Sequence, residues 1–354
     1  MADSEYSTED HNDLRETVRA FCGASFDEAS VRLVMESADG FDHAVWRRLA
    51  GEMGLAGLAV PAEFGGSGAG PVEAGIVFEE LGRAVAPVPY FGTAGLAVPV
   101  LLAVDDRDAA KEYLPSIAAG ETIATVAVHG SVSVIDGALG GSVSYVVDGM
   151  AADLILVAAD GVLYAVSGSA TGLEREPLPV MDLTRRQARL TFRSVPARAV
   201  GSADVLRPAL DVAAALLAAS SVGGAQHVLD MAVGYASTRY QFGRAIGSFQ
   251  AIKHRCADLL AEVESARSVA YHALWAASDR SEPGRELPLA AALAGSYCSE
   301  AFLHAALENV QIHGGIGFTW EHPAHLYVKR AVSDRALLSS PDSHRHRLAA
   351  LAGL

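Results

Sequence analysis

The sequence predicts a mainly helical protein with a β-sheet middle domain, because the period of its apolar residues changes twice. Apolar residues recur at helical spacing from about residue 9 to residue 120. The period becomes two between about 123 and 200, and helical spacing then returns and holds to the C-terminus. We therefore expect an N-terminal helical domain at 1–121, a β-sheet domain at 122–201 and a helical bundle at 202–354.

In the N-terminal part, helices are expected at 10–20, 41–53 and 72–85. A glycine-rich stretch, 64–70, precedes the third of them. It lacks the Lys-Ser/Thr pair and the βαβ setting of a phosphate-binding loop, so it predicts a tight turn. The third helix carries Glu79 and Glu80. For this pair we expect one solvated and one packed carboxylate, without a catalytic role.

The middle part contains short segments rich in Val, Ile and Tyr, separated by Gly, Asp and Ser. Because no helical segment lies between them, they favour an antiparallel sheet or a small barrel. The segments expected as strands are 123–128, 142–147, 154–157, 162–166 and 188–195.

The C-terminal part predicts a four-helix bundle. Four long segments with helical period follow one another with short connections, which is typical of bundles. Their expected bounds are 209–239, 249–279, 287–312 and 321–339.

Composition excludes several function classes. The formal net charge is -15, with 42 acidic and 27 basic residues, and a nucleic-acid partner requires a basic surface. Three widely spaced cysteines predict a reducing compartment, and hence a cytoplasmic protein, better than a disulfide framework. The acidic start of the chain has no apolar core, so no signal peptide is expected. We expect no membrane-spanning segment either.

Two stretches of the predicted bundle suit a dinucleotide. An arginine near a helix end offers a planar fork to pyrophosphate oxygens. Aromatic, glutamine and glycine residues around it provide an apolar face, mixed donors and acceptors, and close backbone approach. The alternative is a surface ion pair for the arginine and a helix C-cap for the glycines. The residues that the resemblance described next implies as cofactor-binding are Arg239, Gln241, Phe242, Ile246 and Gln250 in the first stretch, 237–254, and Gln311, Ile312, His313, Gly314 and Gly315 in the second, 311–322.

Together these stretches resemble the two C-terminal signatures of the acyl-CoA dehydrogenase family, and 53–68 and 78–83 are similar to that family's N-terminal domain. The resemblance covers nearly the whole chain. It implies an N-terminal helical domain, a small antiparallel β-barrel and a C-terminal four-helix bundle. It also implies FAD as cofactor, α,β-dehydrogenation of an acyl-CoA thioester, and an electron-transfer flavoprotein as electron acceptor. In the family, the residues named above reach across a subunit interface to the FAD of a neighbour.

The sequence departs from the family at the catalytic base. One of the two usual places for the glutamate falls at Leu338–Ser340, and the other falls at Ala213. Neither offers a base, so we predict no catalytic residue in this chain. The family's flavin-contacting loops are also missing at 126–131 and 140–153. The chain therefore resembles the smaller, base-lacking subunit of heteromeric bacterial acyl-CoA dehydrogenases, which implies an unlike acyl-CoA dehydrogenase subunit as partner and a heterotetramer.

Two other interpretations stay open. One is a self-sufficient flavoenzyme of this fold with a relocated base or monooxygenase-like chemistry. The other is a flavin-free structural or binding subunit, although such a scaffold has no physical need for Arg239 and Gln311. His313, Glu321 and His322 match no metal-ligand spacing, so no metal site is predicted. Arg185 and Arg186 are candidates for a CoA phosphate.

Overall fold

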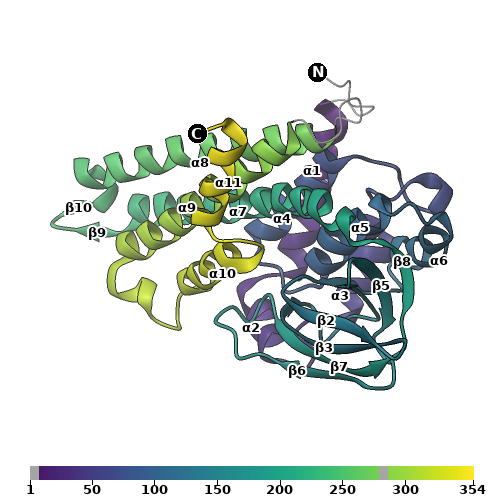
Figure 1. Cartoon of the computed structure of the whole chain (residues 1–354). Coiled ribbons are helices and arrows are strands. Elements are labelled where there is room, and N and C mark those ends of the chain that lie inside the picture. Colours follow the sequence, from purple (N-terminus) through teal and green to yellow (C-terminus); the bar gives the residue numbers. More distant parts are fainter. Residues whose placement is uncertain (1–7, 279–285) are drawn as a thin grey trace. The chain divides into compact units, whose positions relative to one another are not determined.

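The computed structural model describes residues 8–278 and 286–354. The first seven residues, for which the sequence predicts no signal peptide, lie outside this range. Figure 1 shows the order of elements along the chain. The α-helices are α1 (Thr8–Ser25), α2 (Glu28–Glu36), α3 (His43–Arg47), α4 (Pro71–Arg83), α5 (Val98–Ala103), α6 (Arg107–Ala118), α7 (Leu206–Thr238), α8 (Gln250–Ser278), α9 (Leu287–His313), α10 (Ala324–Leu337) and α11 (Pro341–Ala352).

The strands and shorter helical turns complete the fold. The strands are β1 (Ala124–Ala127), β2 (Gly130–Ile135), β3 (Ala138–Val147), β4 (Leu154–Ala159), β5 (Val162–Ser167), β6 (Leu173–Pro177), β7 (Gln187–Val195), β8 (Arg198–Ser202), β9 (Tyr240–Gln241) and β10 (Arg244–Ala245). The turns are η1 (Arg48–Glu52), η2 (Leu55–Gly57), η3 (Ala62–Phe64), η4 (Phe91–Ala97), η5 (Ala203–Val205), η6 (Ile246–Ser248) and η7 (Gly314–Phe318), of which η1 and η4 are π-helical.

The described chain forms two compact units. The first combines residues 8–30, Gly75–Ala86 and Ala214–Leu354, and the second combines Val31–Ala74 and Pro87–Ala213. Each unit therefore draws on segments that lie far apart in the sequence.

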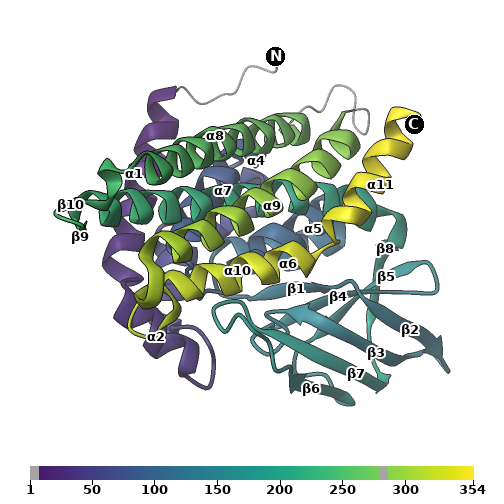
Figure 2. The same cartoon turned by 90° about the vertical axis from the view of Figure 1, so that its left-hand side faces the viewer.

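In the first unit, the long helices α7, α8 and α9 lie side by side, with α10 and α11 against α9 (Figure 2). Glycine allows the backbones of α4 and α7 to meet. A Cβ at Gly223 would lie 1.8 Å from the Glu79 carbonyl oxygen, and one at Gly82 would lie 2.1 Å from that of Ser220. No side chain fits at either place. This close contact fixes α4, and with it Glu79, against the bundle.

The bundle contains one helix more than the sequence predicts. The expected fourth segment, 321–339, begins at Ala324, ends at Leu337 and is followed by α11. The hydroxyl of Ser340 accepts a hydrogen bond from the amide of Ser343 (3.2 Å), and Pro341 occupies the first turn. Both are helix-start signals. The weak hydrophobic periodicity of α11 concealed them.

Helix α7 corrects the expectation that no segment could cross a membrane. The stretch Ala203–Thr238 is long and apolar enough to do so, with a mean hydropathy of 1.5 in its most apolar window. Yet 67% of that window is buried inside the protein. Its apolar character is therefore explained by its central position in the bundle.

The second unit holds the β-sheet domain. Its strands form two four-stranded sheets, ordered β1-β4-β5-β8 and β2-β3-β7-β6. All pairs are antiparallel except β1 and β4, which run parallel. The sequence predicts an antiparallel sheet or small barrel, and the structure differs from it in the parallel pairing of β1 with β4. Residues from both sheets share one core, including Val143, Ile155, Leu190 and Phe192. Alternation predicted β1, β3, β4, β5 and β7 but missed β2, β6 and β8. It also carries no information on pairing partners.

The glycine-rich stretch 64–70 is the tight turn that the sequence predicts. Gly65 and Gly68 have φ values of +84° and +70°, which suit glycine. A Cβ at Gly66 would lie 2.1 Å from the Val60 carbonyl oxygen. The stretch connects η3 to α4.

Candidate functional site

The two predicted cofactor motifs lie at the same end of the bundle. The first begins where α7 ends, continues through the β9–β10 hairpin and reaches the start of α8. The second spans the end of α9 and η7. A small apolar cluster joins them, in which Ala236 and Ile312 pack with Tyr235 and Ile246. Figure 1 shows the hairpin extending beyond the ends of α7 and α8.

Arg239 follows the last residue of α7, and its backbone is fixed. Its amide donates to the Tyr235 carbonyl (2.9 Å) and its carbonyl accepts from the amide of Ile246 (2.8 Å). Its side chain is exposed and makes no ion pair or hydrogen bond within residues 8–278 and 286–354. By contrast, the guanidinium of Arg244 lies over the Phe249 ring at 4.0 Å. Residues 8–278 and 286–354 therefore give the surface ion-pair alternative for Arg239 no support, and its fork of donors is available to an anion.

The hairpin holds apolar side chains away from the core. Phe242 has a φ of +54° and its side chain is 90% exposed, and Gly243 follows with a φ of +78°. The Tyr240 side chain is 67% exposed. A bulky residue in the left-handed region is uncommon and is maintained only by its surroundings. This exposed aromatic surface suits a flat ring or a protein partner.

The remaining predicted residues divide by exposure. The side chains of Gln241, Gln250 and Gln311 are exposed, whereas Ile312 and His313 are buried. A Cβ built at Gly314 or Gly315 would meet no atom within 4 Å, so ligand approach to their backbone is open. Gly314, with a φ of +65°, also ends α9. It is the helix C-cap of the alternative interpretation, a role compatible with ligand contact. An exposed arginine without a partner in the described residues and open glycines at the same end of the bundle fit a diphosphate.

The buried side chain of His313 packs between the second motif and α7. Its ring stacks on Tyr235 of α7 (centroids 4.2 Å apart) and lies 4.3 Å from the ring of His322. Its Nδ1–H donates to the Asn309 carbonyl (2.8 Å), because a carbonyl can only accept. Burial lowers the pKa of His313, an effect that this hydrogen bond partly opposes. The neutral ring therefore links the two motifs, with Tyr235 and His322 as partners that sequence spacing did not reveal.

A small cavity lies at one of the two expected base positions, Leu338–Ser340. Leu338 and Ser339 line it together with Ala214, which follows Ala213 on α7. The cavity offers about 10 Å³ to the centre of a water molecule, which is at the limit for a single water. Leu338 and Ala214 cannot accept a proton. In this arrangement the cavity has no room for an acyl chain.

Sequence reasoning missed two ionisable residues that line the same cavity. Asp334 on α10 is 3% exposed, and His344 on α11 is 8% exposed. A Cβ at Gly295 would lie 2.6 Å from the His344 ring. The ring can therefore pack against α9 because residue 295 has no side chain. Asp334 lies four residues before Leu338 and hence on the same helix face. That four-residue spacing was the one feature of the sequence that could have placed Asp334 near Leu338.

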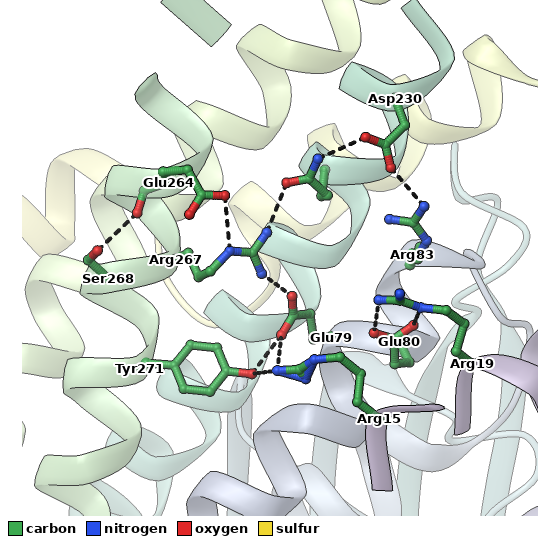
Figure 3. A network of polar contacts seen from close by, with 11 residues as sticks. Arg15, Arg19, Glu79, Glu80, Arg83, Asp230, Glu264, Arg267, Ser268 and Tyr271 are labelled. Atoms are coloured by element: carbon green, nitrogen blue, oxygen red, sulfur yellow. Dashed lines mark hydrogen bonds and ion pairs between the residues drawn. The ribbon is translucent and has the colours of Figure 1, made fainter. Parts of the chain in front are cut away.

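Glu79 and Glu80 form the centre of a buried ion network, which corrects the expectation that one of them is solvated. Both are nearly inaccessible, at 4% and 1% exposure. Arg19 binds Glu80 through two hydrogen bonds of 2.8 and 2.9 Å. Glu79 is bound by Arg267, by Arg15 and by the hydroxyl of Tyr271. Figure 3 shows these side chains converging from α1, α4 and α8. The hydrogen-bonding capacity of both carboxylates is used inside the protein, which indicates a structural role.

Arg185 and Arg186, the candidates for a CoA phosphate, both make contacts within the protein. Arg186 donates to the carbonyls of Met35, Ser37 and Ala38, at the end of α2. The guanidinium of Arg185 lies 5.1 Å from the centre of the Phe91 ring. In the described part of the chain, no group of three or more His, Cys, Asp or Glu side chains is placed to hold a metal ion.

A much larger cavity, about 1040 Å³, lies in the second unit. Phe41, Trp46, Ile123 and Leu178 are among the residues that line it, and none of the predicted cofactor-binding residues does. Cavity volume alone therefore does not locate the candidate site in this protein.

Comparison with known proteins agrees with the fold. Residues 8–121 match the family model "Acyl-CoA dehydrogenase, N-terminal domain", and residues 203–350 match "Acyl-CoA dehydrogenase, C-terminal domain". The chain is 40% identical over 343 residues to the acyl-CoA dehydrogenase IpdE2 of Mycobacterium tuberculosis, covering 96% of each chain.

Solved structures give the same result. The Tcur3481–Tcur3483 steroid ACAD is 30% identical with a TM-score of 0.88, and the alignment covers 98% of both chains. The ChsE4–ChsE5 complex from Mycobacterium tuberculosis is 26% identical with a TM-score of 0.90, again over 98% of both chains. Members of the matched family are FAD flavoproteins that oxidise acyl-CoA thioesters. The chain belongs to the acyl-CoA dehydrogenase family.

Proposed function

We propose that this chain is the base-lacking subunit of a heteromeric, FAD-dependent acyl-CoA dehydrogenase. It completes the FAD site of an unlike subunit, which supplies the catalytic base. The observation that carries the proposal is an asymmetry within the first unit. The exposed bundle end keeps Arg239 and the open glycines, whereas Leu338 and Ala213 stand at the expected base positions and neither can accept a proton.

In this assembly the chain's residues bind and orient. Arg239 pairs with the diphosphate of FAD, and the backbone at Gly314 and Gly315 approaches it closely. The exposed glutamines bind ribose or phosphate oxygens, and Phe242 covers an apolar edge. The flavin, when bound, supplies the hydride acceptor. The partner's carboxylate removes the α proton of the acyl-CoA thioester.

Two solved structures support an unlike partner, since each is named for two different chains. One of them is a steroid ACAD, so steroid acyl-CoA thioesters are the first substrates to test. We further propose a heterotetramer, an electron-transfer flavoprotein as acceptor and a cytoplasmic location.

Flavin occupancy tests the proposal. The chain expressed alone is expected to purify colourless, because it holds only part of the site. Co-expressed with the unlike subunit, it is expected to give a yellow complex with one FAD for each pair of unlike chains. Absorbance of released FAD against protein concentration measures the ratio. A full complement of FAD in the isolated chain contradicts a donated half-site.

One observation favours a second candidate, a self-sufficient enzyme with a relocated base. Asp334 is a carboxylate in the cavity at one of the two expected base positions. In that case the isolated chain oxidises acyl-CoA on its own, and Asp334→Asn lowers its turnover by several orders of magnitude while FAD stays bound. Under the first proposal, Asp334→Asn in the complex leaves turnover within about tenfold, or about 1.4 kcal/mol in the barrier.

A further inference from the structure

His322, the last residue of the second motif, lies where that motif joins the next helix. The segment from Gly314 to Pro323 connects α9 to α10. At its end, the Nδ1 atom of His322 accepts a hydrogen bond from the backbone amide of Ala324, the first residue of α10, at 3.2 Å. The free N–H groups of a first helical turn need such acceptors. Pro323, the N-cap residue, provides no side-chain acceptor.

This hydrogen bond fixes the protonation state of His322. A backbone amide can only donate, so Nδ1 must be unprotonated and the neutral ring must carry its proton on Nε2. The centroid of the His322 ring lies 4.3 Å from that of the His313 ring. The His313 ring is itself neutral and stacks on Tyr235. A continuous series of rings therefore connects α7, α9 and the start of α10.

Protonation of His322 would disrupt this arrangement for three reasons. The Nδ1–H would face the amide of Ala324, and two donors repel each other. The positive charge would lie at the N-terminus of α10, where the helix dipole disfavours cations. It would also lie against His313, which could then not become protonated without like-charge repulsion.

We infer that His322 is a positioning residue for the proposed FAD half-site, and that its neutral ring makes this half-site pH-sensitive. This inference rests on the proposed function for its link to FAD. His322 acts through other groups: it fixes the start of α10 and supports His313, and these hold Gly314 and Gly315 in place.

The sign of the pH effect follows from the geometry. The arrangement needs the neutral form, so it is intact at high pH and is lost as the pH falls and the ring becomes protonated. The other titratable or charged groups at this corner are Glu321 beside the ring, His325 and Lys329 on α10, and Tyr235 on α7. His325 and Lys329 contact the Trp320 ring, at 4.5 and 4.2 Å. Elsewhere in the first unit, burial lowers the pKa of His227 to about 4.

Two substitutions of His322 separate the effect of its hydrogen-bond acceptor from the effect of its positive charge. His322→Asn keeps an oxygen acceptor where Nδ1 lies and cannot become charged. His322→Phe keeps a ring against His313 and removes the acceptor. His325→Gln is the matched control, because it removes a titrating ring on the first turn of α10 that packs on Trp320. His227 remains in every variant, so its own titration cancels in the comparison.

The complex with the unlike subunit is titrated with FAD between pH 8 and pH 5.5. Wild type is expected to lose at least about tenfold in FAD affinity over this range. His322→Asn is expected to bind like wild type at pH 8 and to change by less than about threefold on acidification. His322→Phe is expected to bind weakly at both values. A pH dependence of His322→Asn equal to that of wild type overturns the inference, as does one abolished by His325→Gln.

A second readout needs no FAD. Hydrogen exchange at the amide of Ala324 is measured in the isolated chain, comparing wild type with His322→Asn at the same pH so that intrinsic rates cancel. The two are expected to be equally protected at pH 8, with wild type losing protection at pH 5.5. Equal protection at both values contradicts the inference. If the complex binds no FAD at pH 8 but the exchange result holds, the proposed function fails and the role of His322 at α10 stands.

Discussion

Replacing Arg19 by methionine is expected to lower the free energy of unfolding by about 3–5 kcal/mol, since it leaves a buried carboxylate without its cation. Glu80 is 1% exposed, and Arg19 binds it through both of its oxygens. Methionine retains most of the aliphatic volume, so the loss is mainly one of charge. Urea unfolding followed by circular dichroism measures the effect.

The second unit supplies a matched control with the same geometry but without burial. Arg193 also pairs with a glutamate through two contacts, 2.9 and 3.0 Å to Glu174, but that side chain is 58% exposed. Arg193→Met is expected to cost no more than about 1 kcal/mol, as exposed ion pairs do. If the two arginine substitutions cost the same, burial does not decide the strength of the Arg19–Glu80 pair.

The double substitution Arg19→Met with Glu80→Leu completes the cycle. It leaves no buried charge, so it is expected to recover most of the stability that Arg19→Met loses. A double variant that is as unstable as the sum of the two single variants would show that the cost arises from packing and not from charge.

Replacing Arg239 by alanine is expected to weaken FAD binding to the complex by at least about tenfold, because charge-assisted hydrogen bonds contribute roughly 1.5–3 kcal/mol each. The chain's net charge of -15 offers no diffuse attraction to replace the lost guanidinium. Helicity is expected to stay unchanged, because the Arg239 side chain is exposed and contacts no partner in the described residues. Flavin content and circular dichroism are measured on the same samples.

Two further variants sharpen this test. Arg239→Lys is expected to recover only part of the affinity, since a point charge cannot reproduce the planar fork. Arg255→Ala removes the same charge from α8, where Arg255 pairs with Glu308 at 2.9 Å, and is expected to leave FAD affinity unchanged. Full flavin in Arg239→Ala would exclude Arg239 from the site. A parallel loss of flavin and helicity would give it a structural role.

The sequence by itself determined the fold class and the two cofactor motifs. Apolar period distinguishes helices from strands, and the residue types in 237–254 and 311–322 carry their chemistry wherever the chain places them. It also determined that Ala213 and Leu338 occupy the usual base positions, because the loss of an ionisable group is visible in the residue type alone.

Only the tertiary structure decided which groups meet. The burial of both Glu79 and Glu80 depends on arginines from α1 and α8, far away in the sequence. The same holds for the stack of Tyr235, His313 and His322, for the parallel pairing of β1 with β4, and for Asp334 and His344 in one cavity. Local patterns record how each segment folds. Strand pairing, burial and the charges around an ionisable group arise between segments. They depend on distances in space, which cannot be read from the order of residues.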